Sequence, residues 1–135
     1  KPNNLVSQVK SAPTGVDEQA GLLLTNEEGQ MASVMLSLHS KQPKRGMVSC
    51  EKGYIEIMEY PRAWEATITY TDSGKTELIK AGENADALAY ELADMEKAIN
   101  GDVDCMHFDY TKDVMDIMTY LRKEWNMKYP DENWD

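Results

Sequence analysis

Two histidines and two cysteines are the residues of this chain best suited to acid–base, nucleophilic or metal chemistry. His39 follows a strand-like stretch and precedes a loop that carries Lys41, Lys44 and Arg45. A histidine beside lysines at the edge of a sheet can contact an anionic or polyhydroxylated substrate. We therefore name His39 and Lys41 as candidates for a substrate cleft. The alternative interpretation is an ordinary solvent-exposed basic loop.

The remaining chemistry-bearing residues do not form a recognisable set. Cys105 and His107 lie two positions apart, but a zinc site needs three or four protein ligands, so we predict no metal site. His107 is expected to be a hydrogen-bonded spacer between two helices. Cys50 sits in an apolar strand and is expected to be a small buried hydrophobic residue. Two cysteines also fall short of a disulfide framework.

Motifs for cofactor binding and nucleophilic catalysis are missing from the sequence. It contains no GxGxxG, no GxxxxGK[ST] and no GxSxG motif. Glu91, Asp94 and Glu96 have the pattern of a solvated helix face, whereas catalytic carboxylates need a cleft and perturbed surroundings. We expect no catalytic residue, no metal and no cofactor-binding residue in this chain.

Size and charge restrict the class of protein further. A chain of 135 residues has the size of one domain with a real core. The formal net charge of -10 argues against a nucleic-acid partner, because little would neutralise the phosphates. No apolar run has the length of a membrane span, so we expect no membrane partner. We expect a cytoplasmic location, and a leader sequence upstream of Lys1 stays an open alternative.

Hydrophobic periodicity predicts strands first and helices last. The alternating stretches and turn residues predict strands at 5–11, 20–25, 31–38, 47–51, 54–60, 66–70 and 76–80. The turn sequences "NEEG" (26–29) and "TDSGK" (71–75) predict hairpins. After Gly82 the period becomes helical, which predicts helices at about 84–100 and 111–127.

Each predicted helix has one apolar face, which we expect to be buried against the sheet. The apolar residues are Leu88, Leu92, Met95 and Ile99 in the first helix, and Val114, Ile117, Met118, Leu121 and Trp125 in the second. The predicted fold is therefore α+β: an open-faced, mostly antiparallel sheet of about six strands with two C-terminal helices on one face. Residues 1–130 are expected to form a single domain, and 131–135 a frayed tail.

Two helices cover one face of such a sheet and leave the other open to water or to another protein. The residues on the open face include tyrosines and methionines and few charges, as the centres of protein interfaces do. We predict that this face is a protein–protein contact; the alternative is a hydrated sheet. The candidate interface residues are Ser33, Met35, Ser37, Tyr54, Glu56, Met58, Tyr60, Thr67 and Thr69.

Four stretches in this order resemble a known family. They are "GVDEQAGLLLTNEEGQMASVMLSL" (15–38), "MVSCEKGYIEI" (47–57), "YELADMEKAINGD" (90–102) and "VMDIMTYLRKEWNMKYP" (114–130). Together they resemble the carboxy-terminal domain of the glucose–fructose oxidoreductase, inositol dehydrogenase and rhizopine-catabolism (Gfo/Idh/MocA) family, and its dihydrodiol-dehydrogenase-like members in particular. The resemblance extends over residues 5–130.

The resemblance implies a longer parent protein with an N-terminal Rossmann domain that binds NAD(P). It also implies a homo-oligomer formed through the open sheet face. No residue of this chain matches the family's E-K-P lysine or its histidine-bearing helix, so no catalytic role is transferred. The implied function is the substrate-side and oligomerisation domain of an NAD(P)-dependent oxidoreductase acting on a sugar, cyclitol or related hydroxy compound. On that reading the fragment itself is inactive. The alternative is a stand-alone α+β binding or scaffold module without redox activity.

Overall fold

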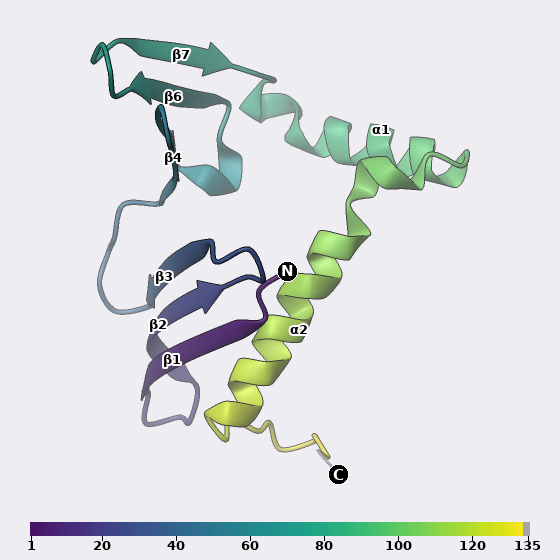
Figure 1. Cartoon of the computed structure of the whole chain (residues 1–135). Coiled ribbons are helices and arrows are strands. Elements are labelled where there is room, and N and C mark those ends of the chain that lie inside the picture. The colour runs from purple at the N-terminus through teal and green to yellow at the C-terminus, as the bar shows by residue number, and fades with distance from the viewer. Residues whose placement is uncertain (134–135) are drawn as a thin grey trace. The chain divides into compact units, whose positions relative to one another are not determined.

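The computed structural model describes residues 1–133 of the chain. These residues form two compact units, which are described separately below. One unit contains Lys1–Lys41 together with the described residues from His107 onward, and the other contains Gln42–Met106. The predicted fold class is confirmed: antiparallel open sheets are followed by two helices (Figure 1). The prediction that residues 1–130 form one domain stays a prediction.

Residues 1–133 contain seven strands and two α-helices. In chain order the elements are β1 (Asn4–Ser11), β2 (Asp17–Thr25), β3 (Met31–Ser37), β4 (Arg45–Cys50), β5 (Gly53–Met58), the 3₁₀ turn η1 (Tyr60–Arg62), β6 (Glu65–Tyr70), β7 (Thr76–Lys80), η2 (Asn84–Asp86), α1 (Ala87–Ile99), η3 (Val103–Met106) and α2 (Phe108–Glu124). The strands form two sheets, with orders β1-β2-β3 and β4-β5-β6-β7, instead of one sheet of about six strands.

The first unit is a three-stranded meander with α2 beside it (Figure 1). The β2–β3 hairpin closes as predicted, because the Asn26 side-chain oxygen accepts the backbone N–H groups of Glu28 and Gln30 at 3.1 and 2.9 Å. On β1, the Ser7 hydroxyl joins the sheet to the helix: it accepts the Trp125 indole N–H at 2.8 Å and donates to Glu124 at 2.9 Å. These bonds fix the C-terminal half of α2 against β1.

The buried residues of the first unit are few. They are Ala20 on β2, Leu121 on α2, Met127 just after α2, and the carboxylate-bearing Glu18. Of the predicted apolar face of α2, Leu121 is buried and Ile117 and Trp125 are half-buried, whereas Val114 and Met118 are exposed. Burial of this helix is therefore concentrated in its last turns.

The segment after α2 returns to the helix. Arg122 lies 4.2 Å from the Tyr129 ring and forms an ion pair with Glu132, which also accepts the Tyr129 backbone N–H at 3.0 Å. Part of the predicted tail is thus held by α2. Residues 134–135, the rest of that tail, lie outside the described residues.

The second unit is a four-stranded meander followed by α1. None of residues 42–106 is buried. The predicted burial of Leu88, Leu92, Met95 and Ile99 is wrong for the described structure, in which these side chains are 53–75% exposed. Helical periodicity identified the apolar side of α1 correctly, but α1 makes its main contacts with η2 and η3, not with the sheet.

Backbone geometry corrects the predicted end of the fifth strand. The fifth strand ends at Met58, because Glu59 takes a left-handed conformation (φ 50°) and Pro61 lies in the following 3₁₀ turn. Tyr60 is consequently the first residue of η1 and not a strand residue. α1 begins after Asp86 and α2 begins after His107, and neither of these two side chains makes a capping hydrogen bond.

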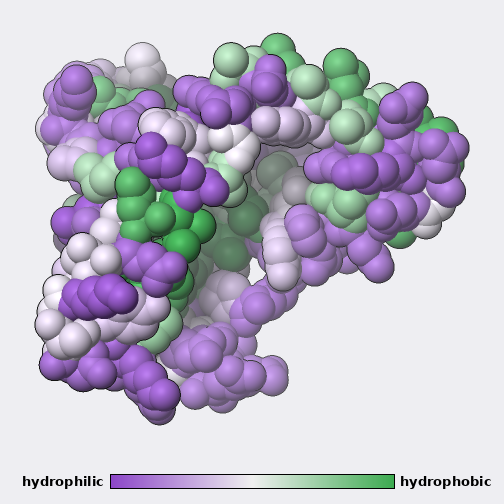
Figure 2. All heavy atoms as spheres, turned by 90° about the horizontal axis from the view of Figure 1, so that it is seen from above, coloured by the Kyte–Doolittle hydropathy of each residue, from purple (hydrophilic) through white to green (hydrophobic). Residues whose placement is uncertain are grey.

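The solvent-accessible surface of this chain is larger than expected for globular units of its size. Its solvent-accessible surface is 10986 Å², whereas two separate globular units of half the mass of this 15.3 kDa chain would expose about 8,600 Å². Apolar side chains contribute visibly to this surface (Figure 2). Contiguous exposed apolar residues are typical of surfaces that bind another protein.

Candidate functional site

The open face of the β4–β7 sheet collects five of the predicted interface residues. Strand register places Tyr54 opposite Thr69 and Glu56 opposite Thr67, and Met58 follows on the same side of β5. Because alternate strand residues share a face, all five lie on one side of the sheet. We call this surface the tyrosine–methionine face.

The same register adds residues that the sequence analysis did not assign to the face. Met47 lies opposite Glu56, Arg45 lies opposite Met58, and Leu78 lies opposite Thr67. Met47 and Leu78 are exposed. Alternation within β4 and β7 divides the residues of each strand into two faces. Only the pairing of neighbouring strands decides which of these faces lies on the same side of the sheet as Tyr54 and Met58.

Charged side chains on the tyrosine–methionine face are paired with one another. Arg45 lies 3.5 Å from Glu56, and Lys80 lies 3.9 Å from Glu65. Lys80 also lies 4.6 Å from the centre of the Trp64 ring. The face therefore has no net charge from these four groups, in a chain whose formal charge is -10. Local neutrality reduces the repulsion that two copies of an acidic chain would otherwise experience.

A close backbone approach supports this face from within the sheet. Gly53 begins β5 opposite Tyr70, and a Cβ atom at Gly53 would lie 2.1 Å from the Thr69 carbonyl oxygen. Only glycine fits this position without a shift of the backbone. The glycine thus fixes the pairing of β5 with β6, and with it the register of Tyr54 and Thr69.

The other predicted interface residues lie on the β1–β3 sheet. Ser33, Met35 and Ser37 alternate along β3 and share one face. Met35 is exposed and lies over Gly21, where an added Cβ would be 3.2 Å from its sulfur atom. The Ser37 hydroxyl accepts hydrogen bonds from the Ser40 N–H and hydroxyl at 3.1 and 2.7 Å, so it orders the turn that follows β3.

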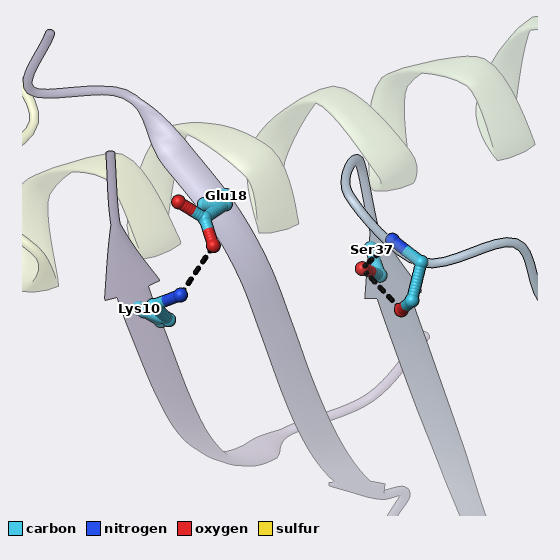
Figure 3. A network of polar contacts seen from close by, with 4 residues as sticks. Lys10, Glu18 and Ser37 are labelled. Atoms are coloured by element: carbon cyan, nitrogen blue, oxygen red, sulfur yellow. Dashed lines mark hydrogen bonds and ion pairs between the residues drawn. The ribbon is translucent and has the colours of Figure 1, made fainter. Parts of the chain in front are cut away.

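A polar cluster at the end of the β1–β2 hairpin lies beside the start of the segment that holds His39, because the Leu38 N–H donates to the Glu18 carbonyl at 3.0 Å. Its centre is Glu18, which is only 8% exposed and forms an ion pair with Lys10 (Figure 3). The register shifts between Lys10 and Ser11, and this irregularity brings the two charged side chains together. His39 and Lys41 lie in the exposed segment after β3.

The pKa of Glu18 is below the ordinary glutamate value. The main cause is the hydrogen bond from Lys10; burial opposes it, and the charges of Lys10 and His39 lower the pKa further. A carboxylate, an ammonium and an imidazole in one area can hydrogen-bond hydroxyl groups of a ligand. Without a hydroxyl or thiol nucleophile among them, these three groups do not form a nucleophile–base pair.

The remaining chemistry-bearing residues have local structural roles. The Cys105 thiol donates to the Asp102 carbonyl at 3.0 Å, and burial, followed by the charges of Asp102 and Asp94, raises its pKa. His107 stacks on Tyr110 with ring centres 5.4 Å apart. Cys50 is exposed, so its predicted burial is wrong: the residue ends β4, where nothing in the unit covers it.

Neither helix start fits the pyrophosphate of a dinucleotide. Glu83 and Asp86 precede α1, and Asp109 lies in the first turn of α2. Carboxylates at a helix N-terminus occupy the position that an anionic ligand would use. Within residues 1–133, no group of three or more His, Cys, Asp or Glu side chains is arranged to hold a metal ion. No helix in this range has the length and hydrophobicity needed to cross a lipid bilayer.

One open depression of about 310 Å³ lies in the first unit, between the N-terminal residues and α2. Lys1 at its edge pairs with Asp113 and Asp116 at 3.0 and 2.7 Å. Its lining also includes Leu5, Ile117 and Tyr120. Comparison with models of known protein families and with characterised proteins gives no match to this chain.

Proposed function

We propose that this chain is the substrate-side and oligomerisation domain of an NAD(P)-dependent oxidoreductase that acts on a sugar, a cyclitol or a related hydroxy compound. The proposal combines the sequence resemblance to the Gfo/Idh/MocA family with the tyrosine–methionine face. The observation that carries it is the register of β4–β7, which gathers Tyr54, Met58, Met47 and Leu78 on one open surface with paired charges. Such a surface suits contact with a second copy.

In this proposal the cofactor belongs to the Rossmann domain of the parent protein. That domain would bind NAD(P), which supplies hydride transfer, while this chain supplies one wall of the substrate cleft and the assembly surface. The acidic starts of α1 and α2 agree with this division. The Lys10–Glu18 pair and His39 are the groups of this chain that we assign to hydroxyl-bearing substrates.

The decisive experiment is to express the longer reading frame and compare it with this chain. We expect the upstream sequence to encode a strand followed by GxGxxG and, later, an E-K-P motif. Titration with NADH and NADPH, followed by fluorescence, should show binding to the longer protein and none to the 135-residue chain. An upstream frame without these motifs would contradict the proposal and favour the stand-alone binding or scaffold module.

A further inference from the structure

The unit Gln42–Met106 has two apolar surfaces whose side chains are exposed, apart from the half-buried Ile68. The first is the side of the β4–β7 sheet opposite the tyrosine–methionine face, where Val48, Ile55 and Ile68 form one cross-strand row and Ile79 lies on β7; we call it the inner sheet face. The second is the α1 stripe, formed by Leu88, Leu92, Met95 and Ile99. Both surfaces carry aliphatic side chains of the kind that proteins bury.

The connection between β7 and α1 holds the helix in its observed direction. Gly82 has a φ of +71°, and the Tyr90 ring lies 3.3 Å from the position that a Gly82 Cβ would take. The Tyr90 hydroxyl accepts the backbone N–H of Glu83 at 3.0 Å. A side chain of α1 is thus locked onto the turn that precedes the helix, with the α1 stripe left exposed.

Charge distribution restricts what can cover the α1 stripe. Residues 81–106 contain seven acidic residues and one basic residue, whereas residues 42–80 contain six of each. Packing α1 against α1 of another copy would bring two strongly acidic segments together, which electrostatics opposes. Packing α1 against the neutral β4–β7 sheet carries no such cost.

We propose that two copies of this chain exchange α1, so that the α1 stripe of each copy packs on the inner sheet face of the other. The arrangement is isologous and covers both bare surfaces of both copies in a single closed dimer. The exchange covers eight apolar side chains in each copy, and seven of them are 36–75% exposed in the single chain. The inference goes beyond the proposed function, because it requires neither a cofactor nor another domain.

The test is cross-linking between two differently labelled full chains, each with Cys50→Ser and Cys105→Ser. One chain carries Leu92→Cys and the other carries Ile55→Cys. After mixing and treatment with a short bis-maleimide, we expect a covalent heterodimer on a denaturing gel. The matched control replaces Leu92→Cys by Ala93→Cys, which is adjacent in sequence but about 100° around the helix. The heterodimer should be lost with this control.

A single chain carrying both Leu92→Cys and Ile55→Cys tests the other occupants. Product confined to the intrachain species would show that α1 closes on its own sheet, and would overturn the exchange. Absence of both products would show that another molecule covers the stripe, which also overturns it. Repeating the mixing with Met58→Glu in both chains separates this contact from the tyrosine–methionine face. The heterodimer should persist, and its loss would mean that the cross-link depended on that face and not on exchange.

Discussion

Met58→Glu is the sharpest test of the tyrosine–methionine face. Met58 is 48% exposed, so covering it removes about half of a methionine side chain from water, which contributes roughly 1 kcal/mol per copy. A two-fold interface contains the residue twice. The substitution should therefore weaken the association by at least about 2 kcal/mol per dimer, or about 30-fold in Kd. Enclosing two additional carboxylates in the interface increases the loss, because they must be removed from water.

The choice of glutamate protects the fold of the single chain. Met58 lies opposite Arg45 on β4, so the new carboxylate gains a cross-strand partner of opposite charge. Met58→Lys instead places two positive charges opposite each other and should cost about 0.2–1 kcal/mol of folding stability. Both variants should lose association, while Tm should fall for the lysine variant alone. Gln42→Glu, at an exposed loop position, is the control for added charge.

The assay is sedimentation equilibrium over a concentration series, with thermal unfolding in parallel. Each variant is measured alone and combined with Leu92→Glu, which removes the α1 contact proposed above. Equal association constants for Met58→Glu, Gln42→Glu and the parent sequence would refute the assignment of this face as an interface. The chain that carries Leu92→Glu alone should still associate through the tyrosine–methionine face. If that chain is monomeric, the assignment is refuted as well.

Two further predictions concern stability. The hydrogen bond from Lys10 lowers the pKa of Glu18. The ionised Glu18 side chain therefore stabilises the fold above the ordinary glutamate pKa, and this contribution is lost as the pH falls through the lowered pKa. In thermal melts from neutral to acidic pH, Glu18→Gln should lower the Tm at pH 7 and reduce the fall of Tm in acid. Gly53→Ala should destabilise the chain by about 1–3 kcal/mol in urea unfolding, because its Cβ meets the Thr69 carbonyl, whereas Gly46→Ala on β4, with open space around it, should cost little. Equal effects of the two alanines would contradict the close-approach argument.

Local sequence patterns predicted much of the secondary structure. Alternation located the strands, "NEEG" and "TDSGK" located two hairpins, and the change of period after Gly82 located the helices. Strand parity also placed Tyr54, Met58 and Thr69 on one face before the register was known. These features depend on residues close together in the sequence, where conformational preference and side-chain alternation act directly.

The wrong predictions concern which parts of the chain contact one another in three dimensions. Periodicity identified the apolar side of α1, but a stripe does not specify its partner, so its burial was predicted wrongly. Division of the strands into two sheets depends on which edges pair, and edge pairing leaves little trace in strand composition. Tyr60 was misassigned because Pro61 ends the strand earlier than alternation suggests. The Lys10–Glu18 pair was missed because it depends on a register shift.

The meander order of both sheets has a consequence for the order of folding. Every strand pairs with its neighbour in the sequence, so the strands can assemble through short hairpin closures with little loss of chain entropy. The bonds that join β1 to the end of α2 connect residues 117 and 118 positions apart, Ser7 with Glu124 and Ser7 with Trp125. On the ribosome β1–β3 would emerge long before α2, so this sheet would form before the helix that packs on it had been synthesised.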